Sequence, residues 1–100
     1  MRKIINGKLY NTDTAEFVDE YTYSYPSDFN YEYEKLYRKR TGEFFLYGEG
    51  GPASKYSVCT GQNEWSGGEK LIPLSDDEAR EWLEEKSDAD TYLQYFTAEE

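Results

Sequence analysis

Polar and apolar side chains alternate along much of the first half of the chain. Residues 17–24 and 31–38 carry a large aromatic or aliphatic side chain at nearly every second position. This period of two is typical of β-strands whose two faces meet different surroundings. Residues 43–47 (Glu-Phe-Phe-Leu-Tyr) are almost continuously apolar, which favours a central strand. Gly42 suits the left-handed turn position that would join the last two strands into a hairpin.

Two further strand signals flank this region. Residues 3–10 hold two short apolar runs around Asn6-Gly7, a pair typical of a two-residue type I′ hairpin turn. Residues 70–74 (Lys-Leu-Ile-Pro-Leu) predict a last strand. Because Pro73 cannot donate a hydrogen bond to a neighbouring strand, this strand is expected at an edge of the sheet.

The stretch between these strands is rich in glycine. Residues 48–54 and 61–68 predict loops, with a short strand over 55–59 between them. Cys59 is the only cysteine, so no internal disulfide is possible. We interpret it as a small buried apolar side chain, since unpaired cysteines are among the most buried residues.

The C-terminal quarter changes to a helical pattern. Ser75 followed by Glu78 forms a capping box, in which each side chain bonds the other residue's backbone N–H. A helix is therefore predicted over 76–86, with its acidic first turn at the positive end of the helix dipole. Its apolar side chains recur at three- and four-residue steps and are expected to face the sheet. They are Ala79, Trp82 and Leu83.

A second, shorter helix is predicted over 89–96, capped by Ser87 or Asp88. Its apolar face would consist of Tyr92, Leu93 and Phe96. Strands followed by helices favour an α+β fold. We therefore expect a single domain over residues 1–100: an antiparallel sheet built from two hairpins plus edge strands, with one or two C-terminal helices packed on one face.

The composition supports this fold and restricts the partners. Aromatic side chains make up 18% of the chain, which supplies a core and disfavours disorder. The net charge is −10, so the surface repels phosphate backbones and anionic membranes. Such a charge either only confers solubility or attracts a basic partner. Neither a signal peptide nor a membrane span is expected, so the predicted location is cytoplasmic.

Little in the sequence indicates catalysis. Histidine is absent, which removes the commonest general base and zinc ligand, and the acidic residues show no distinctive spacing. We expect no enzyme activity, no metal and no cofactor. A glycine run at 48–51 followed by Lys55 faintly resembles a phosphate-binding loop, which leaves a small nucleotide-binding protein as an alternative. Lys35 and residues 38–40 form a basic cluster beside tyrosines. It indicates either a surface for single-stranded nucleic acid or a solvated hairpin tip.

Acidic residues are concentrated at the C-terminal end. Residues 75–100 carry ten acidic and two basic side chains, a net charge of −8, whereas residues 1–74 carry eleven and nine, a net charge of −2. On the predicted first helix the acids recur at three- and four-residue steps. A row of carboxylates on a rigid helix can compete with a phosphate backbone for lysine and arginine, or it can be an ordinary solvated face. The row consists of Asp77, Glu81, Glu84, Glu85 and Asp88.

Tyrosine supplies a second candidate contact. Six tyrosines between positions 21 and 37 exceed what one sheet face needs, and tyrosine is enriched at protein interfaces. We expect at least two of them to be exposed and to anchor a protein partner. The candidate anchors are Tyr21, Tyr23 and Tyr33.

Several segments resemble small proteins carried by phages and mobile elements of gut Firmicutes. They include residues 4–15 (Ile-Ile-Asn-Gly-Lys-Leu-Tyr-Asn-Thr-Asp-Thr-Ala), 41–51 (Thr-Gly-Glu-Phe-Phe-Leu-Tyr-Gly-Glu-Gly-Gly) and 72–75 (Ile-Pro-Leu-Ser), and the resemblance covers nearly the whole chain. In size and charge the chain is similar to anti-CRISPR inhibitors from this setting. The resemblance implies an inhibitor that binds a bacterial defence nuclease complex and blocks its basic nucleic-acid-binding surface. The alternative is a non-catalytic accessory protein of a mobile element that binds another basic protein.

Overall fold

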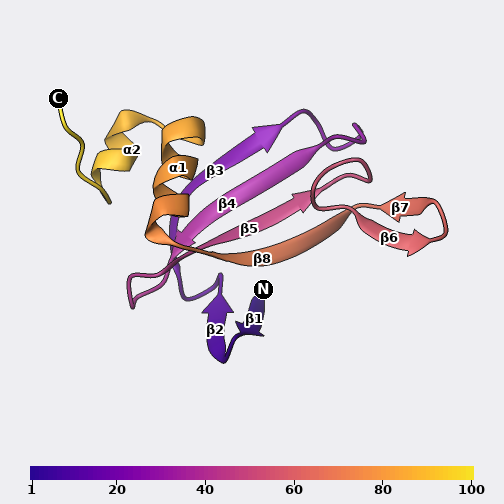
Figure 1. The fold of residues 1–100 in the computed structure, drawn as a ribbon, viewed down its shortest axis with the longest axis horizontal. Coiled ribbons are helices and arrows are strands. Elements are labelled where there is room, and N and C mark those ends of the chain that lie inside the picture. Colours follow the sequence, from indigo (N-terminus) through magenta and orange to yellow (C-terminus); the bar gives the residue numbers. More distant parts are fainter.

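The computed structural model describes all of residues 1–100 and contains a four-stranded antiparallel sheet, two separate hairpins and two helices (Figure 1). The strands of the sheet, in the spatial order β3-β4-β5-β8, span Glu16–Tyr23 (β3), Glu32–Arg38 (β4), Phe44–Gly50 (β5) and Gly68–Leu74 (β8). The hairpins pair β1 (Arg2–Ile5) with β2 (Lys8–Asn11), and β6 (Val58–Gly61) with β7 (Glu64–Ser66). The helices are α1 (Asp76–Lys86) and α2 (Ala89–Leu93). The predicted α+β fold is confirmed.

The turns follow from the residues that occupy them. Asn6 and Gly7 have positive φ angles of 51° and 77°, as a type I′ turn requires, and the predicted N-terminal hairpin is confirmed. Gly42 has φ 95° in the turn between β4 and β5, and its N–H donates to the Lys39 carbonyl at 2.8 Å. Strand β8, which contains Pro73, lies at an edge of the sheet as predicted.

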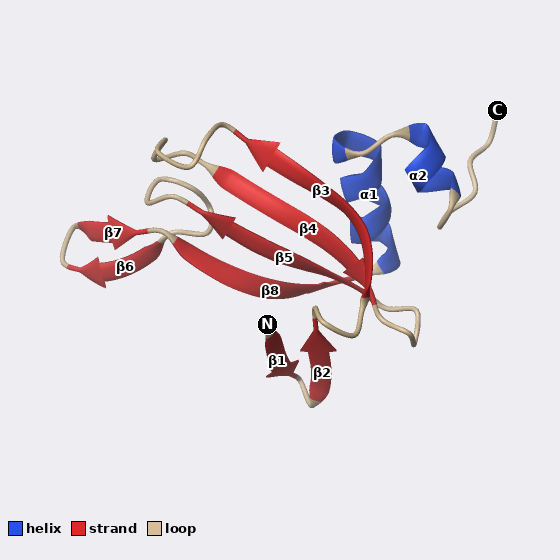
Figure 2. Cartoon of the chain, turned by 180° about the vertical axis from the view of Figure 1, so that it is seen from behind, coloured by secondary structure: helices blue, strands red, loops and turns tan.

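The sheet buries side chains on both of its faces. On one face α1 packs against the central strands, and the N-terminal hairpin packs against the other (Figures 1 and 2). The buried residues on the helix-covered face are Leu36, Phe44, Leu46, Ala79, Trp82 and Leu83. Those on the opposite face are Tyr10, Tyr37, Phe45 and Leu71. The helical stripe is therefore buried against the sheet as expected.

The molecule is elongated along the strands. Its principal extents are 48 × 33 × 20 Å, with the helices at one end of the sheet and hairpin β6–β7 projecting from the other (Figure 1). The radius of gyration of 14.8 Å is larger than the roughly 13 Å typical of a 100-residue domain. Neither helix has the length and apolar character needed to cross a membrane.

Several local predictions are wrong, and most concern the glycine-rich region. The predicted loop over 48–54 begins later, because residues 48–50 extend β5. The expected strand over 55–59 and the loop over 61–68 are replaced by hairpin β6–β7 and the start of β8. Cys59 is exposed, since its hairpin projects beyond the layers that would cover it. Helix α2 ends at Leu93, whose side chain is exposed.

Candidate partner-binding surface

The acidic face of α1 is fixed by a complete cap at the start of the helix. The Ser75 hydroxyl accepts a hydrogen bond from the Glu78 N–H at 3.1 Å, and the Glu78 carboxylate accepts one from the Ser75 N–H at 3.0 Å. This is the predicted capping box. Since the apolar stripe of α1 is buried against the sheet, the acidic side chains on the other side of the helix are exposed.

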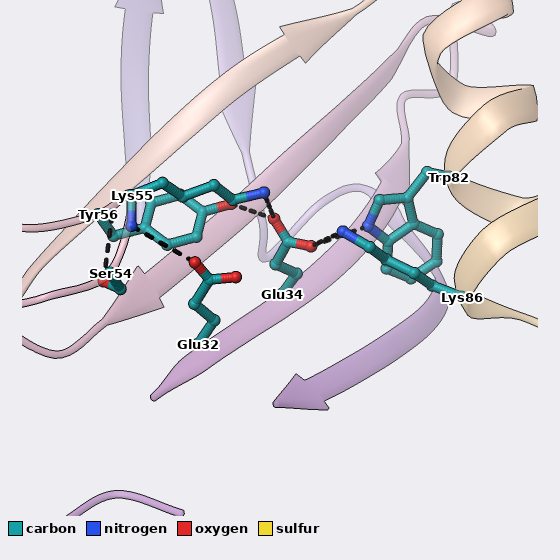
Figure 3. A network of polar contacts seen from close by, with 7 residues as sticks. All are labelled: Glu32, Glu34, Ser54, Lys55, Tyr56, Trp82 and Lys86. Carbon is teal, nitrogen blue, oxygen red and sulfur yellow. Dashed lines mark hydrogen bonds and ion pairs between the residues drawn. The ribbon is translucent and has the colours of Figure 1, made fainter. Parts of the chain in front are cut away.

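A buried carboxylate ties α1 to the centre of the sheet. Glu34 of β4 has no exposed surface, and four donors from other segments converge on it (Figure 3). The Trp82 Nε1 lies 3.2 Å from Glu34 Oε1, and the Tyr56 hydroxyl donates to Oε2. Two ammonium groups complete the set, Lys86 at 2.7 Å and Lys55 at 2.9 Å. The donors of Trp82 and Lys86 lie on the helix, so Glu34 holds α1 in place.

The environment of Glu34 favours its ionised form. Burial alone would raise the pKa of its carboxyl group, because a charge is costly to remove from water. Hydrogen bonds from Lys86, Tyr56 and Lys55, together with the charge of Lys86, outweigh that effect and lower the pKa to about 2. Glu34 is therefore a fixed negative charge inside the fold.

The pairing of Lys86 with Glu34 leaves most of the acidic helix face without counter-ions. Lys86, one of the two basic residues on the helix, points inward, and its side chain is only 20% exposed. The other, Arg80, pairs with Asp77 at 2.8 Å and lies over the Phe96 ring. None of the five ion pairs in the structure involves the remaining carboxylates of the helix face. Those exposed, unpaired carboxylates are Glu81, Glu84 and Glu85.

The two ends of the predicted row have structural roles. Asp77 is exposed but carries its own cation in Arg80. Asp88 is the N-cap of α2, and its side chain accepts a hydrogen bond from the Thr91 N–H at 2.8 Å, which lowers the pKa of the Asp88 carboxyl. The row predicted from the sequence is thus continuous and exposed, and its three central members are the ones free to bind.

The three candidate tyrosines do not share one surface. Tyr23 is 53% exposed at the end of β3, on the helix-covered side of the sheet. Tyr21 lies on the same side but is partly buried, with the Lys86 Nζ 5.0 Å from its ring centroid. Tyr33 is on the opposite face, where its hydroxyl donates to Glu20 at 2.6 Å. The expectation of two exposed tyrosines is confirmed by Tyr23 and Tyr25.

The glycines that faintly resembled a phosphate-binding loop are required by packing. An added Cβ at Gly48 would lie 2.0 Å from the Tyr56 ring, and one at Gly50 would lie 2.2 Å from the Ser54 hydroxyl. These glycines allow residues 54–56 to cross closely over β5, which brings Tyr56 to Glu34. No group of three or more acidic or cysteine side chains is arranged to hold a metal ion.

The predicted basic cluster is dispersed in the structure. Lys35 lies on the face of β4 away from the helices, beside Tyr33. Arg38 is spread over the rings of Phe44 and Tyr95, with its guanidinium carbon 5.4 and 5.6 Å from their centroids. These cations therefore contribute to intramolecular packing and do not line one continuous groove.

Comparison of the chain with protein-family models, with curated proteins and with solved structures gives no match.

Proposed function

We propose that this protein is an inhibitor of the anti-CRISPR type, which binds a bacterial defence nuclease complex in the host cytoplasm and blocks a basic nucleic-acid-binding surface. The observation that supports it is the exposed, unpaired row of Glu81, Glu84 and Glu85 on a helix anchored to the sheet. Blocking needs no catalytic group in the inhibitor, and the protein is proposed to act without enzyme activity or a cofactor.

The chemistry of the row suits competition with nucleic acid. Arginine and lysine bind carboxylates and phosphates through the same charge-assisted hydrogen bonds. The helical rise of about 1.5 Å per residue places Glu84 roughly 4.5 Å and Glu85 roughly 6 Å along the axis from Glu81. Because Glu34 already holds the two nearest lysines, the row does not have to give up internal ion pairs before it binds a partner.

Long-range attraction would add to these contacts. A net charge of −10, concentrated at the helical end, steers a basic partner toward α1 and makes association sensitive to salt. Tyr23 is exposed on the same side of the sheet, at the end of β3, and supplies an aromatic contact to a partner that extends along the sheet.

The alternative partner is another basic protein that a mobile-element accessory protein would bind. It would use the same carboxylates, so only the identity of the captured protein distinguishes the two functions. A nucleotide-binding function has less support, because the glycines at 48–50 are occupied in packing against residues 54–56.

The test is displacement of labelled target DNA from purified CRISPR effector complexes, together with capture of these complexes by the tagged protein at low and high salt. The wild-type chain should capture an effector and displace its DNA, and capture should weaken as salt rises. The triple reversal Glu81→Lys, Glu84→Lys, Glu85→Lys should abolish both effects.

A control with the same change in net charge separates the row from the overall charge. Asp13→Lys, Glu64→Lys, Glu99→Lys alters three exposed acids away from α1. This control should retain binding, with slower association. Recovery of the protein alone, in mixtures where intact effectors are present, would reject the inhibitor function and favour the accessory-protein alternative.

A further inference from the structure

A groove lies beside α1, on the helix-covered face of the sheet. It has a volume of about 290 Å³ and combines buried apolar side chains with exposed carboxylates. The apolar lining comes from Leu46, Tyr56, Ile72, Leu74 and Trp82. Lys55 and Glu34, which are paired with each other at 2.9 Å, also line it. The carboxylates at its rim are Glu78, Glu81 and Glu85 of α1. The groove therefore has a largely apolar base and a negatively charged edge.

The groove divides the acidic row into two sides. Glu81 and Glu85 line it, whereas Glu84 and Asp88 line a different hollow between α1 and α2. Each of the two hollows is therefore lined by two carboxylates of the row. The first side adjoins Trp82 and Tyr56, and the second adjoins Tyr92.

We propose that this groove binds an arginine side chain from a basic segment of the partner protein. The proposal rests on the proposed function, since it names the chemical group through which the basic partner would be held. The guanidinium is planar and weakly hydrated, and it pairs with two carboxylate oxygens at once. Apolar side chains would receive its aliphatic stem, and Glu81 or Glu85 would receive its charge.

The surroundings favour this occupant over others. Lys55, which lines the groove, and Lys86 are both paired with Glu34, and neither Glu81 nor Glu85 forms an ion pair within the fold. Glu78 is engaged in the helix cap, which leaves Glu81 and Glu85 as the free acceptors. Anionic ligands are repelled by the rim. Lysine has a compact, strongly hydrated ammonium group, which lacks the planar, two-pronged geometry that matches a carboxylate.

The probe is a short capped peptide with two arginines, compared with its lysine and leucine counterparts. Trp82 lines the groove and Trp65 lies in the distant hairpin, so the fluorescence of a Trp65→Phe background reports on the groove. The arginine peptide should produce a saturable change in Trp82 emission. The lysine peptide should bind several-fold more weakly, and the leucine peptide should not bind.

Two variant pairs with the same change in charge locate the binding. Glu81→Gln with Glu85→Gln removes the free carboxylates of the groove, and about tenfold weaker binding of the arginine peptide is expected. Asp13→Asn with Glu64→Gln removes two exposed carboxylates that lie outside α1 and outside the row. That control should change the affinity less than about twofold.

Three results would overturn the proposal: equal weakening by both pairs, no saturable change in Trp82 emission, or binding of the leucine peptide. Light scattering adds a fourth, since a dimer that dissociates in the Glu81→Gln, Glu85→Gln variant would assign the groove to a second copy of the chain. The peptide assay contains no effector complex. Arginine binding without capture of an effector would therefore reject the inhibitor function alone. Effector capture that both pairs weaken equally would reject the groove alone.

Discussion

Glu34 shows how one buried charge can organise its surroundings. A carboxylate inside a protein is stable only where donors replace its lost water, and Glu34 receives donors from Lys55, Tyr56, Trp82 and Lys86. The environment also changes the pKa of Tyr56. Burial raises the pKa of the Tyr56 hydroxyl well above its ordinary value, and the hydrogen bond to Glu34 raises it further. The hydroxyl therefore remains a donor throughout the physiological range.

We predict that Glu34→Gln destabilises the protein in a pH-dependent way. The folded-state pKa of about 2 lies below the ordinary value of 4.5, so the contribution of Glu34 is complete above pH 4.5 and is lost as pH falls toward 2. At pH 7 the substitution should lower the free energy of unfolding by about 3 kcal/mol. Urea unfolding at pH 7 and pH 3 measures it. A loss of the same size at both pH values would contradict this prediction. Glu84→Gln, which changes an exposed carboxylate, is the control.

A second prediction concerns Gly48, whose backbone is crossed by Tyr56. Gly48→Ala introduces a methyl group 2.0 Å from the Tyr56 ring, which must move or force the strand apart. The expected loss is about 1–3 kcal/mol in thermal or urea unfolding. Gly61→Ala is the matched control, because its nearest neighbour is the carboxylate end of exposed Glu64. Equal stability of the two variants would contradict this prediction, because it would mean that residues 54–56 can move aside without any loss of stability.

At the scale of elements, the sequence predicted those that carry strong local signals. The capping box at Ser75 and Glu78 located α1 with both ends correct, and the Asn6-Gly7 pair located the N-terminal hairpin. Hairpin β6–β7 was missed because residues 61–68 contain three glycines, and its turn residue Asn63 (φ 60°) is as typical of loops as of hairpins. The β-branched residues beside Cys59 were the only signal that could have located β6.

The sequence predicted the carboxylate row of the candidate site, but it could not predict that the row lacks counter-ions. Helical spacing alone predicted the carboxylate row, since three- and four-residue steps define one face of α1. Its freedom from counter-ions depends on Lys55 and Lys86 reaching Glu34, and these residues lie 21 and 52 positions away along the chain. In the sequence, Glu34 has the spacing of a solvated strand residue, so no local pattern distinguishes it from Glu32.

The two small hairpins should differ in their stability. Hairpin β6–β7 has strands of four and three residues and contributes no side chain to either buried cluster, while its Trp65 is 58% exposed. Hairpin β1–β2 is also two-stranded but places Tyr10 in the core. Isolated two-stranded hairpins are only marginally stable in water.

Hydrogen exchange measures this difference directly. We predict that the amides of β6–β7 exchange at least about 100-fold faster than those of β4 and β5, because they open without global unfolding. The amides of β1–β2 should exchange at intermediate rates. If β6–β7 were as protected as the central strands, the hairpin would have to be part of the cooperative core.

At the scale of the whole molecule, negative charge and exposed aromatic side chains are separated along the long axis. The helical end carries most of the net negative charge, while exposed aromatic residues lie farther along the sheet, at the end of β3, on the loop after it and on hairpin β6–β7. These exposed aromatics are Tyr23, Tyr25, Phe29 and Trp65. A partner held at α1 would therefore meet a charged surface first, with aromatic side chains available only if it extends along the sheet.

Concentrating unpaired carboxylates on one helix has a cost that salt should reveal. Glu81 and Glu85 are four residues apart and repel each other, as do Glu84 and Asp88, and like charges at this spacing destabilise a helix. We predict that raising NaCl from 20 to 500 mM increases Tm by a few degrees, because salt screens this repulsion. Glu81→Gln, Glu84→Gln, Glu85→Gln should raise Tm at low salt and flatten its dependence on salt.

The control neutralises three acids that have no like-charged neighbours on a helix turn: Asp13→Asn, Glu64→Gln, Glu99→Gln. If this control raised the low-salt Tm as much as the row variant, the repulsion would belong to the net charge of the molecule. If only the row variant did so, the row would carry a local stability cost. A local stability cost of this kind is expected where the carboxylates serve to bind a basic partner, because function commonly trades against stability.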